Sequence, residues 1–401
     1  MKKSSLSSEQ LEFQQYTRRW LAENKPPPPP VRLPQNPIEV MSEEQRDYLQ
    51  DWQHKCYEAG LVGADLPEAY GGGGHEGFQR LANQEMNAAG TPFLINVIGL
   101  NMAVPTILVH GSEEQKRRFV PPALSGEEIW CQGFSEPGAG SDMANQQTTA
   151  VRKGESWVVN GHKVWTSLGH FAKWMILIAR TSRDHKYDGL TYFLCPIEGA
   201  TGVTVRPLIK LTGESGFNEV LFEDVEVPDS MRLDEVGKGW TVAMTTLTYE
   251  RGAAESAGGG GGNAIHPVQQ LIQLSRESTR DGVRAADDPL TRDAIVQQAI
   301  WAEAIVQNAR RSRVPALCEQ PMRIPLQMKV TVTEFTQSNS RLGVDIAGAR
   351  STLYKLDTRA PDDGHWPLAY MSSYGHTIAA GTNEIQRNIL GERVLGLPKS
   401  K

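Results

Sequence analysis

The first third of the chain has the period of amphipathic helices. Ser7 and Gln10 have the spacing of a capping box, and the same device returns at Ser42 and Gln45 and after Gly111. Apolar side chains follow the first two starts at helical spacing: Phe13, Tyr16 and Trp20, then Leu49, Trp52 and Cys56. Prolines at residues 26–30 end the first helix, because such a run is extended and stiff. We therefore predict a helical domain over residues 1–125.

The pattern of apolar positions changes near Trp130. Five short stretches rich in Val, Ile, Thr and aromatic residues are typical of β-strands, and they cover residues 157–159, 173–179, 190–196, 203–208 and 219–227. Asn160-Gly161 lies between Val159 and Lys163 and is the strongest two-residue turn signal, so it predicts a hairpin there. We therefore predict an antiparallel β domain over residues 126–235.

A helical period returns after Pro228. Apolar side chains recur at spacings of four and three in two segments: Ile295, Ala299, Ala302, Val306 and Ala309, then Ile385, Ile389 and Val394. Thr382 is a good N-cap for the last helix. The order α, β, α predicts an α+β multidomain protein whose residues 236–401 form a helical domain. Because βαβ alternation is absent from the pattern, the many glycines do not indicate a Rossmann unit.

Residues 258–262 are five consecutive glycines inside a pattern that is otherwise helical. Each glycine costs about 1 kcal/mol relative to alanine in a helix interior, so we expect the run to break the helix. Two interpretations stay open. The run is either a flexible surface loop or a break that widens a ligand cavity.

Composition narrows the classes of function. The chain has 401 residues, a net charge of −6, 39% apolar and 22% charged residues, which is typical of a soluble globular protein. It has no Lys/Arg block and no apolar run near about 18 residues, so we expect no nucleic-acid partner and no membrane span. Four scattered cysteines and no signal-peptide core favour a reduced, cytoplasmic location. The dispersed histidines predict no zinc site.

Candidate chemistry gathers in two neighbouring stretches. Residues 131–142, CQGFSEPGAGSD, are polar, and Gly138 and Gly140 let the backbone approach a flat or phosphorylated ligand. The expected hairpin brings Trp165, Thr166 and Ser167 to one edge of the sheet. An aromatic face, two hydroxyls and a glycine loop suit a flavin better than a metal or a nucleic acid. Together they indicate a redox enzyme.

Three blocks of the sequence resemble a known family. They are residues 131–142, the turn 164–167 with its trailing Lys173-Trp174, and residues 381–387, GTNEIQR. Their sequence, order and spacing resemble the signature blocks of the acyl-CoA dehydrogenase family, and the similarity covers nearly the whole chain. The resemblance implies an N-terminal helical domain, a central β domain and a C-terminal four-helix bundle. It also implies FAD as the cofactor and an acyl-CoA as the substrate.

The resemblance also implies roles for individual residues. The residues expected to contact FAD are Gln132, Phe134, Ser135, Trp165, Thr166, Ser167, Arg280, Thr382 and Glu384. Within this set, Ser135 would bond the pyrimidine end of the flavin, and Arg280 would reach the FAD phosphates across a subunit boundary. Ser141 would lie where the family contacts the acyl-CoA.

The reaction also needs a carboxylate base that removes the α-proton of the thioester, and donors at the thioester oxygen. The family usually carries the base just before the Gly-Thr of the third block, where this chain has Ala380. Isovaleryl-CoA and long-chain acyl-CoA dehydrogenases carry it instead on a helix, just before an arginine, which matches Glu250 and Arg251. We therefore expect Glu250 to be the base, Arg251 to position the substrate and the Ala380 N–H to hold the thioester oxygen. The competing interpretation is that Glu250 and Arg251 form a solvated helix pair.

A second departure concerns assembly. Many homotetrameric members have a Gln-x-x-Gly-Gly contact to the FAD of a neighbour, but residues 345–350 here read DIAGAR. A homodimer or homotetramer is the family expectation, and a heteromer with a different subunit is the alternative.

The expected reaction forms a trans-2-enoyl-CoA and passes electrons to an electron-transfer flavoprotein, as in β-oxidation. The alternatives are an acyl-CoA oxidase or a flavin monooxygenase on the same fold, or a non-catalytic subunit of a heteromeric dehydrogenase. The intact set of Ser135, Ser141 and Trp165 argues against a non-catalytic subunit, since a purely structural subunit does not need residues that contact a flavin.

Overall fold

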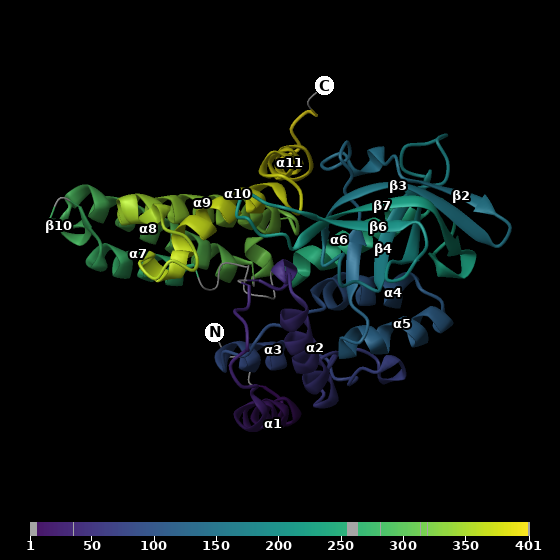
Figure 1. Ribbon diagram of the computed structural model, residues 1–401, viewed down its shortest axis with the longest axis horizontal. Helices are drawn as coiled ribbons and strands as arrows, with labels where there is room; N and C mark the ends of the chain where they lie inside the picture. Colours follow the sequence, from purple (N-terminus) through teal and green to yellow (C-terminus); the bar gives the residue numbers. More distant parts are fainter. Residues whose placement is uncertain are drawn as a thin grey trace. The chain divides into compact units, whose positions relative to one another are not determined.

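The computed structural model describes residues 6–34, 36–254, 264–280, 282–312, 314–318 and 320–399, with the side chains of 251–254 and 280 outside the description. The chain forms two compact units, Met1–Arg251 and Gly252–Lys401. In Figure 1 the first unit is coloured from purple to teal and the second from green to yellow. The first unit contains helices and one large sheet, and the second is mostly helical.

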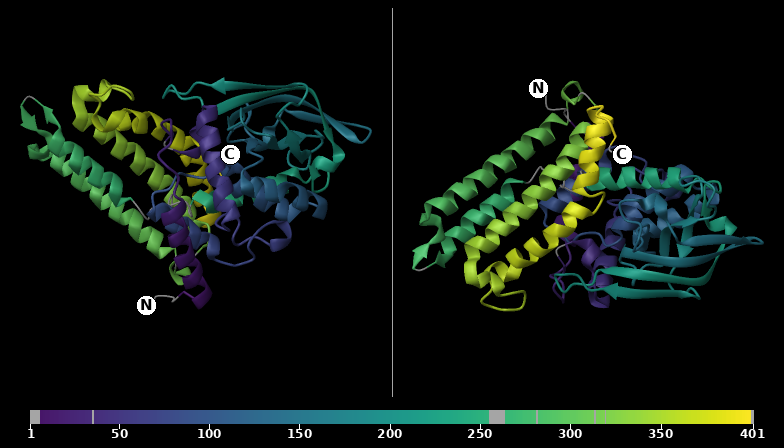
Figure 2. Two further views of the ribbon diagram at one scale, coloured as in Figure 1. Left: turned by 60° about the horizontal axis from the view of Figure 1, so that its bottom comes forward. Right: turned by 90° about the horizontal axis from the view of Figure 1, so that it is seen from above.

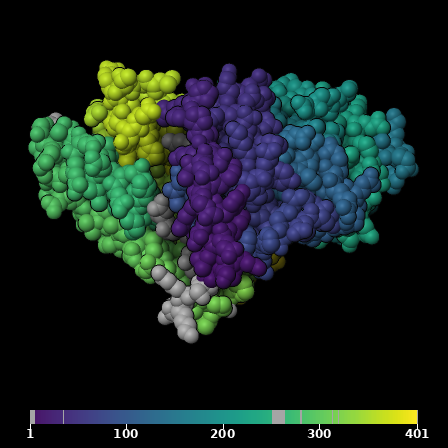
Figure 3. Space-filling model, turned by 90° about the horizontal axis from the view of Figure 1, so that it is seen from below, coloured from purple at the N-terminus to yellow at the C-terminus, as the bar shows by residue number. Residues whose placement is uncertain are grey.

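The first third of the chain is helical, as predicted. Its α-helices are α1 Ser8–Asn24, α2 Glu43–Glu58, α3 Phe78–Ala88, α4 Val104–His110 and α5 Glu113–Ser125. Capping boxes at Ser7, Ser42 and Ser112 begin α1, α2 and α5, which confirms the three predicted starts. On the surface in Figure 3, this purple and blue segment lies beside the teal strands of the same unit.

The central segment forms an eight-stranded sheet in the order β6-β7-β3-β2-β4-β5-β8, with β1 beside β4. Its strands are β1 Trp130–Gly133, β2 Thr149–Lys153, β3 Ser156–Ser167, β4 Trp174–Arg180, β5 Leu190–Pro196, β6 Val203–Leu208, β7 Phe217–Pro228 and β8 Arg232–Leu233. The five predicted strands correspond to β3–β7. Most neighbouring strands are antiparallel, as predicted, but β1 and β2 each pair with β4 in parallel.

The predicted hairpin at Asn160-Gly161 is wrong, because β3 runs through both residues. The Asn160 side chain bonds across to Asp224 of β7, where the register shifts. The reason for glycine at position 161 is close packing and not a turn, because a Cβ there would lie 2.3 Å from Thr148 Oγ1. The tight connection lies at Gly154, whose φ of 63° is favourable for glycine, between β2 and β3.

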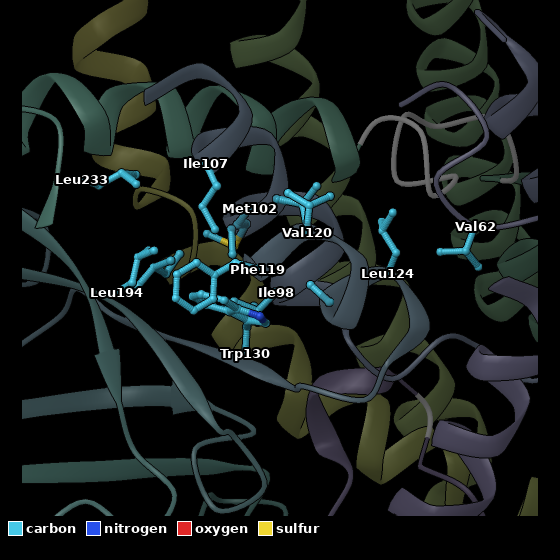
Figure 4. Packing of buried hydrophobic residues seen from close by; sticks show 14 of the residues in the cluster. Val62, Ile98, Met102, Ile107, Phe119, Val120, Leu124, Trp130, Leu194 and Leu233 are labelled. Carbon is cyan, nitrogen blue, oxygen red and sulfur yellow. The ribbon is translucent and has the colours of Figure 1, made fainter. Parts of the chain in front are cut away.

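Aromatic side chains join the helices to the sheet within the first unit. Phe119 of α5 packs edge-on against Trp130 of β1 and Trp174 of β4, with ring centroids 5.7 and 5.0 Å apart. Figure 4 shows part of this buried cluster, including Phe119 and Trp130. Trp52 and Cys56 of α2 belong to the same cluster, which confirms the predicted inner face of that helix.

Helix α6, Gly239–Ala254, is tied to the same unit by buried hydroxyls. The Thr246 hydroxyl lies 2.9 Å from that of Thr106 on α4 and 2.9 Å from that of Tyr192 on β5. His110, the last residue of α4, lies 2.8 Å from Asp234 Oδ2 and 2.9 Å from Thr245 Oγ1. These contacts fix which face of α6 points inward.

The second unit is built on four long helices, which run side by side in both views of Figure 2. They are α7 Ile265–Glu277, α8 Pro289–Arg311, α9 Arg323–Ala347 and α10 His365–Ile378. A short ribbon of β9 Thr279–Arg280 and β10 Val283–Arg284 connects α7 and α8. Thr382 caps α11 Asn383–Ile389, as predicted, and a π-helical turn Leu390–Val394 continues it.

Two further findings for the described residues concern membrane spans and metal sites. Across these ranges, no helix combines the length and the apolar character that a membrane span requires. In the same ranges, no group of three or more His, Cys, Asp or Glu side chains is placed to hold a metal ion.

Packing of α10 on α9 depends on Gly343. A Cβ at Gly343 would lie 1.8 Å from the buried ring of Trp366, so we expect Gly343→Ala to destabilise the protein by about 2 kcal/mol through overpacking. Gly375→Ala is the matched control, because open space surrounds that helical position and alanine favours a helix by about 1 kcal/mol. Urea unfolding measures both. Equal stability of Gly343→Ala and the wild type would contradict this account of the packing.

Asp229 adds a pH-dependent contribution to the stability of the sheet. Hydrogen bonds from Arg232 and from Trp157 Nε1 lower the pKa of Asp229 to about 2. The carboxylate therefore stabilises the fold above its unfolded pKa of about 3.9, and this contribution is lost as the pH falls toward 2. We expect Asp229→Asn to cost about 1 kcal/mol at pH 7 and less at pH 3.

Urea unfolding at both pH values measures this difference. Glu223→Gln, at an exposed position on strand β7, which ends just before Asp229, is the control and should show no such change with pH. A deficit of Asp229→Asn that is as large at pH 3 as at pH 7 would exclude the ionised carboxylate as its source.

Candidate functional site

The first two signature blocks meet in the first unit. Strand β1 pairs with β4 and ends at Gly133, so the chain leaves the sheet at Phe134 and Ser135. The Val164 N–H donates a hydrogen bond of 2.9 Å to the Ser135 carbonyl oxygen. This bond holds residues 134–135 against β3, next to residues 165–167. The structure therefore brings together six residues expected to contact the flavin: Gln132, Phe134, Ser135, Trp165, Thr166 and Ser167.

A buried ion pair, which no pattern in the sequence indicates, lies behind this junction. Lys163 is fully buried, and its Nζ lies 2.8 Å from Glu136 Oε1 and 3.2 Å from the Phe134 carbonyl oxygen. Gln146 accepts a third bond from Lys163. Glu136 also accepts bonds from the N–H groups of Gln147 at 2.6 Å and Thr148 at 3.0 Å. A lysine and a glutamate 27 residues apart give no sequence signal that they pair.

The pKa values follow from this burial. Loss of water lowers the pKa of Lys163 to about 8, although the Glu136 charge acts in the opposite direction. Burial raises the pKa of Glu136, but the Lys163 charge and the hydrogen bonds outweigh burial, and the pKa stays below its ordinary value. Glu136 is therefore a carboxylate at neutral pH and keeps its partner charged.

Trp165 is held in an unusual conformation. Its φ is 60°, in the left-handed region, at the point where β3 shifts register against β7 between Lys163 and Thr166. A conformation of this kind costs about 1–3 kcal/mol in a residue other than glycine. The side chain is 60% exposed and meets Phe217 edge-on, with centroids 6.0 Å apart. The backbone strain turns a large aromatic face outward.

Thr166 and Ser167 follow Trp165 and are both buried. The Thr166 Oγ1 atom has no hydrogen-bond partner in the described part of the chain, whereas its backbone carbonyl accepts a bond of 3.1 Å from Asn218. A buried hydroxyl without a hydrogen-bond partner costs free energy of folding. The Thr166 hydroxyl is therefore available to bond to a ligand. Asn218 also bonds to His170, which braces this side of the junction.

The glycine-rich stretch forms an open turn. Glu136 and Ala139 bridge across it, and a Cβ at Gly138 or Gly140 would meet nothing within 4 Å. Ser141 is exposed beyond this turn. The structure therefore leaves room for a ligand at Ser141, whose substrate contact stays a prediction.

Arg180 fixes the loop after Ser141. It is 7% exposed, and its guanidinium donates to the carbonyl oxygens of Ala144 at 2.6 Å and Gln146 at 2.9 Å. It also donates to carbonyl oxygens of the loop before β5, at Ser182, His185 and Lys186. Burial is the main cause that lowers its pKa from the ordinary arginine value. The Arg180 side chain thus holds the loop after Ser141 and the loop before β5 together by hydrogen bonds to their backbone oxygens.

Glu250 lies near the end of α6 and is half-buried. It follows Val242 and Thr246 at spacings of eight and four residues, and both of these are fully buried. Helical periodicity therefore puts Glu250 on the inward stripe of α6. This position disfavours the interpretation of Glu250 as part of a fully solvated pair.

The third block belongs to the second unit. Ala380 and Gly381 have φ values of 54° and 84°, which form the sharp turn between α10 and α11. Gln386 donates to their carbonyl oxygens at 3.0 and 3.3 Å. Thr382 Oγ1 accepts from the Ile385 N–H at 3.2 Å, and these contacts bring Ala380, Thr382 and Glu384 together on one turn. Ala380 is exposed.

Lys329 of α9 supports this turn. Lys329 donates to Asn383 Oδ1 at 2.8 Å and to the Thr377 carbonyl oxygen at the end of α10 at 3.3 Å. Burial lowers the pKa of Lys329, and the Glu384 carboxylate partly opposes that shift. Hydrogen bonds from the backbone N–H of Glu384 itself and from Thr382 lower the pKa of Glu384. The turn therefore carries an exposed anion at the start of α11.

Three of the sequence predictions fall where the structure gives no side-chain description. The side chains of Arg251 and Arg280 lie outside the described residues, as do residues 258–262 altogether. The roles expected for them stay predictions.

Nearly the whole chain matches one family. Residues 7–127, 131–225 and 237–395 match the N-terminal, middle and C-terminal domains of acyl-CoA dehydrogenases. The chain belongs to the acyl-CoA dehydrogenase family, a family of flavoprotein oxidoreductases. The family and the three-part fold expected from the sequence are confirmed.

Individual relatives agree with this placement. The acyl-CoA dehydrogenase IpdE1 of Mycobacterium tuberculosis is 36% identical over 354 residues, which cover 87% of this chain and 88% of that protein. The structure of the ChsE4–ChsE5 complex from the same organism has a TM-score of 0.78 at 27% identity and covers 99% of this chain and 100% of its own. A variant of the Tcur3481–Tcur3483 steroid ACAD has a TM-score of 0.79 at 25% identity and covers 98% and 100%.

Members of this family bind FAD, and the junction of residues 134–135 with 165–167 fits that cofactor. The outward face of Trp165 suits a flat ring system, and Thr166 Oγ1 lacks a partner in the described residues. Ser135 is half-buried beside them. The residues at this junction therefore fit a bound FAD.

We predict that the Thr166 hydroxyl destabilises the FAD-free chain but contributes to FAD binding. The variant Thr166→Val tests both effects. The variant keeps the shape but removes the hydroxyl, so the FAD-free chain should be as stable as the wild type or more stable by about 1 kcal/mol. Its affinity for FAD should fall about tenfold, which calorimetric titration measures. Thr204→Val on the edge strand β6 is the control. An unchanged FAD affinity in Thr166→Val would remove Thr166 from the binding site.

Proposed function

We propose that this protein oxidises an acyl-CoA thioester to its trans-2-enoyl-CoA, with Glu250 as the base. The observation that carries the assignment of the base is the position of Glu250 on the inward, half-buried stripe of α6. Ala380, at the place where the family usually has its base, has no acid group and is exposed. Glu250 is the acidic residue of α6, directly before an arginine, which supports the assignment.

The proposed reaction divides the substrate hydrogens between two acceptors. The Glu250 carboxylate takes the α-proton, and negative charge develops on the thioester oxygen as the C–H bond breaks. Bound FAD would supply the acceptor for the β-hydrogen, which leaves the substrate as a hydride. The Ala380 N–H donates to the thioester oxygen, where such a donor stabilises the developing charge most strongly. Arg251 and Ser141 hold the substrate against these groups.

The cofactor contacts are proposed in two groups. Gln132, Phe134 and Ser135 border the flavin on one side and Trp165, Thr166 and Ser167 on the other, supported by the Ser135–Val164 bond that joins the two segments. In the second unit, Thr382 and Glu384 contact FAD from the start of α11, and Arg280 reaches FAD phosphates.

We propose an acyl group that is larger than a short straight chain. One similar structure is of a steroid ACAD, and the run of glycines at residues 258–262 is consistent with a widened substrate cavity. Electrons then pass to an electron-transfer flavoprotein, as the family resemblance implies.

We also propose that assembly involves a second, different subunit. The contact motif Gln-x-x-Gly-Gly is absent from residues 345–350, and one similar structure is of a ChsE4–ChsE5 complex. Purification of the chain alone and together with a partner, followed by measurement of mass and bound FAD, tests this proposal. A homotetramer with full FAD occupancy from the chain alone would refute it.

The variant Glu250→Gln tests the assigned base. It should bind FAD and acyl-CoA, but anaerobic bleaching of the flavin by substrate should slow by about 10³-fold, within the range for loss of a general base. A panel of straight-chain, branched and ring-bearing acyl-CoAs identifies the substrate class in the wild type at the same time. Glu303→Gln on α8 is the control and should bleach normally. Normal bleaching by Glu250→Gln would exclude Glu250 as the base.

A further inference from the structure

The Lys163–Glu136 pair has no role in the proposed proton transfer, yet it is the most deeply buried ion pair among those recorded for the described residues. The exposed fractions of the two side chains are 0% and 4%. Burial of two charges is costly, and an apolar pair of the same volume is often as stable or more stable. The stability of the sheet alone therefore does not explain why the buried residues at positions 163 and 136 are ionised.

The pair is placed directly behind both flavin segments. Glu136 follows Ser135 in the chain, and Lys163 precedes Val164, so the ion pair and the Val164–Ser135 backbone bond lie side by side. Lys163 Nζ also binds the Phe134 carbonyl oxygen directly. Any change in the charge or position of the pair is therefore transmitted to residues 134–136 and to the start of the Trp165 bulge.

Polar and charged groups surround the pair. Gln146 donates to the Phe134 carbonyl oxygen at 2.8 Å and accepts from Lys163, so it closes a ring of polar contacts. Arg180 donates to the Gln146 carbonyl oxygen and attracts Glu136 at longer range. Two cations and one anion thus stand in a region with little water, where charges act on a neighbouring ligand with little screening.

We propose that the buried Lys163–Glu136 pair is a positioning and charge-balancing element that sets the midpoint potential of the bound FAD. Two-electron reduction of the isoalloxazine at neutral pH adds negative charge to the ring system. A cation behind the ring therefore favours the reduced cofactor and an anion disfavours it, while the balanced pair holds the potential between these limits. The proposal rests on the proposed FAD contacts of residues 134–135 and 165–167.

Charge-changing variants of the holoenzyme test the proposal. Lys163→Met leaves the Glu136 carboxylate, which still accepts the two backbone bonds, without its cation. We expect the ratio of affinities for reduced and oxidised FAD to fall about tenfold, which for a two-electron couple is a drop of about 30 mV in midpoint potential. The double variant Lys163→Met/Glu136→Gln removes both charges at similar volume and should return the potential close to that of the wild type. Redox titration with reference dyes measures both.

The outcomes are distinct. A potential that is unchanged in Lys163→Met, with FAD bound, overturns the proposal, and so does a double variant that deviates as far as the single one, because the effect would then come from altered packing. If Lys163→Met does not fold, Glu136→Gln and the double variant are compared with the wild type instead. Equal midpoint potentials in all three proteins would overturn the proposal. Failure of the wild-type protein to bind FAD, both alone and together with a partner subunit, would instead refute the proposed function.

Discussion

The backbone bond from Val164 to Ser135 is the contact on which the candidate site in the first unit depends. It joins a segment that leaves the parallel strand β1 to a segment of the long antiparallel strand β3. The ion pair of Lys163 and Glu136 lies behind this bond, and the register shift that includes Trp165 lies between Lys163 and Thr166. Without this junction, the two signature blocks would be separate loops of one sheet.

Backbone strain and an unpartnered polar atom occur where a ligand is expected, although both also occur elsewhere in the described residues. Trp165 and Ala380 both have left-handed φ values, although neither is glycine. Thr166 carries a buried hydroxyl without a partner in the described residues. Such features lower the stability of the chain by itself and are commonly found at binding sites, where a ligand uses them. By contrast, the cores under the helices and sheet are apolar and closely packed.

Local signals in the sequence were reliable where one short segment decides the outcome. The capping boxes at Ser7, Ser42 and Ser112 formed as predicted, because a cap needs only residues three positions apart. The five predicted strands also formed. The Asn160-Gly161 signal failed because strand β7 supplies the bonds that a turn would otherwise make, and Thr148 requires glycine for close approach. Partners distant in the chain overrode a strong local preference.

The sequence by itself determined the family, the order of helical and β segments, and the residue types that suit a flavin, because periodicity and motifs are local properties of a chain. Tertiary structure alone decided the pairing of Lys163 with Glu136, the clamp of Arg180 on two loops and the outward face of Trp165. Each of these depends on residues that the fold brings together across strands, and no spacing along the chain encodes which buried charge meets which partner.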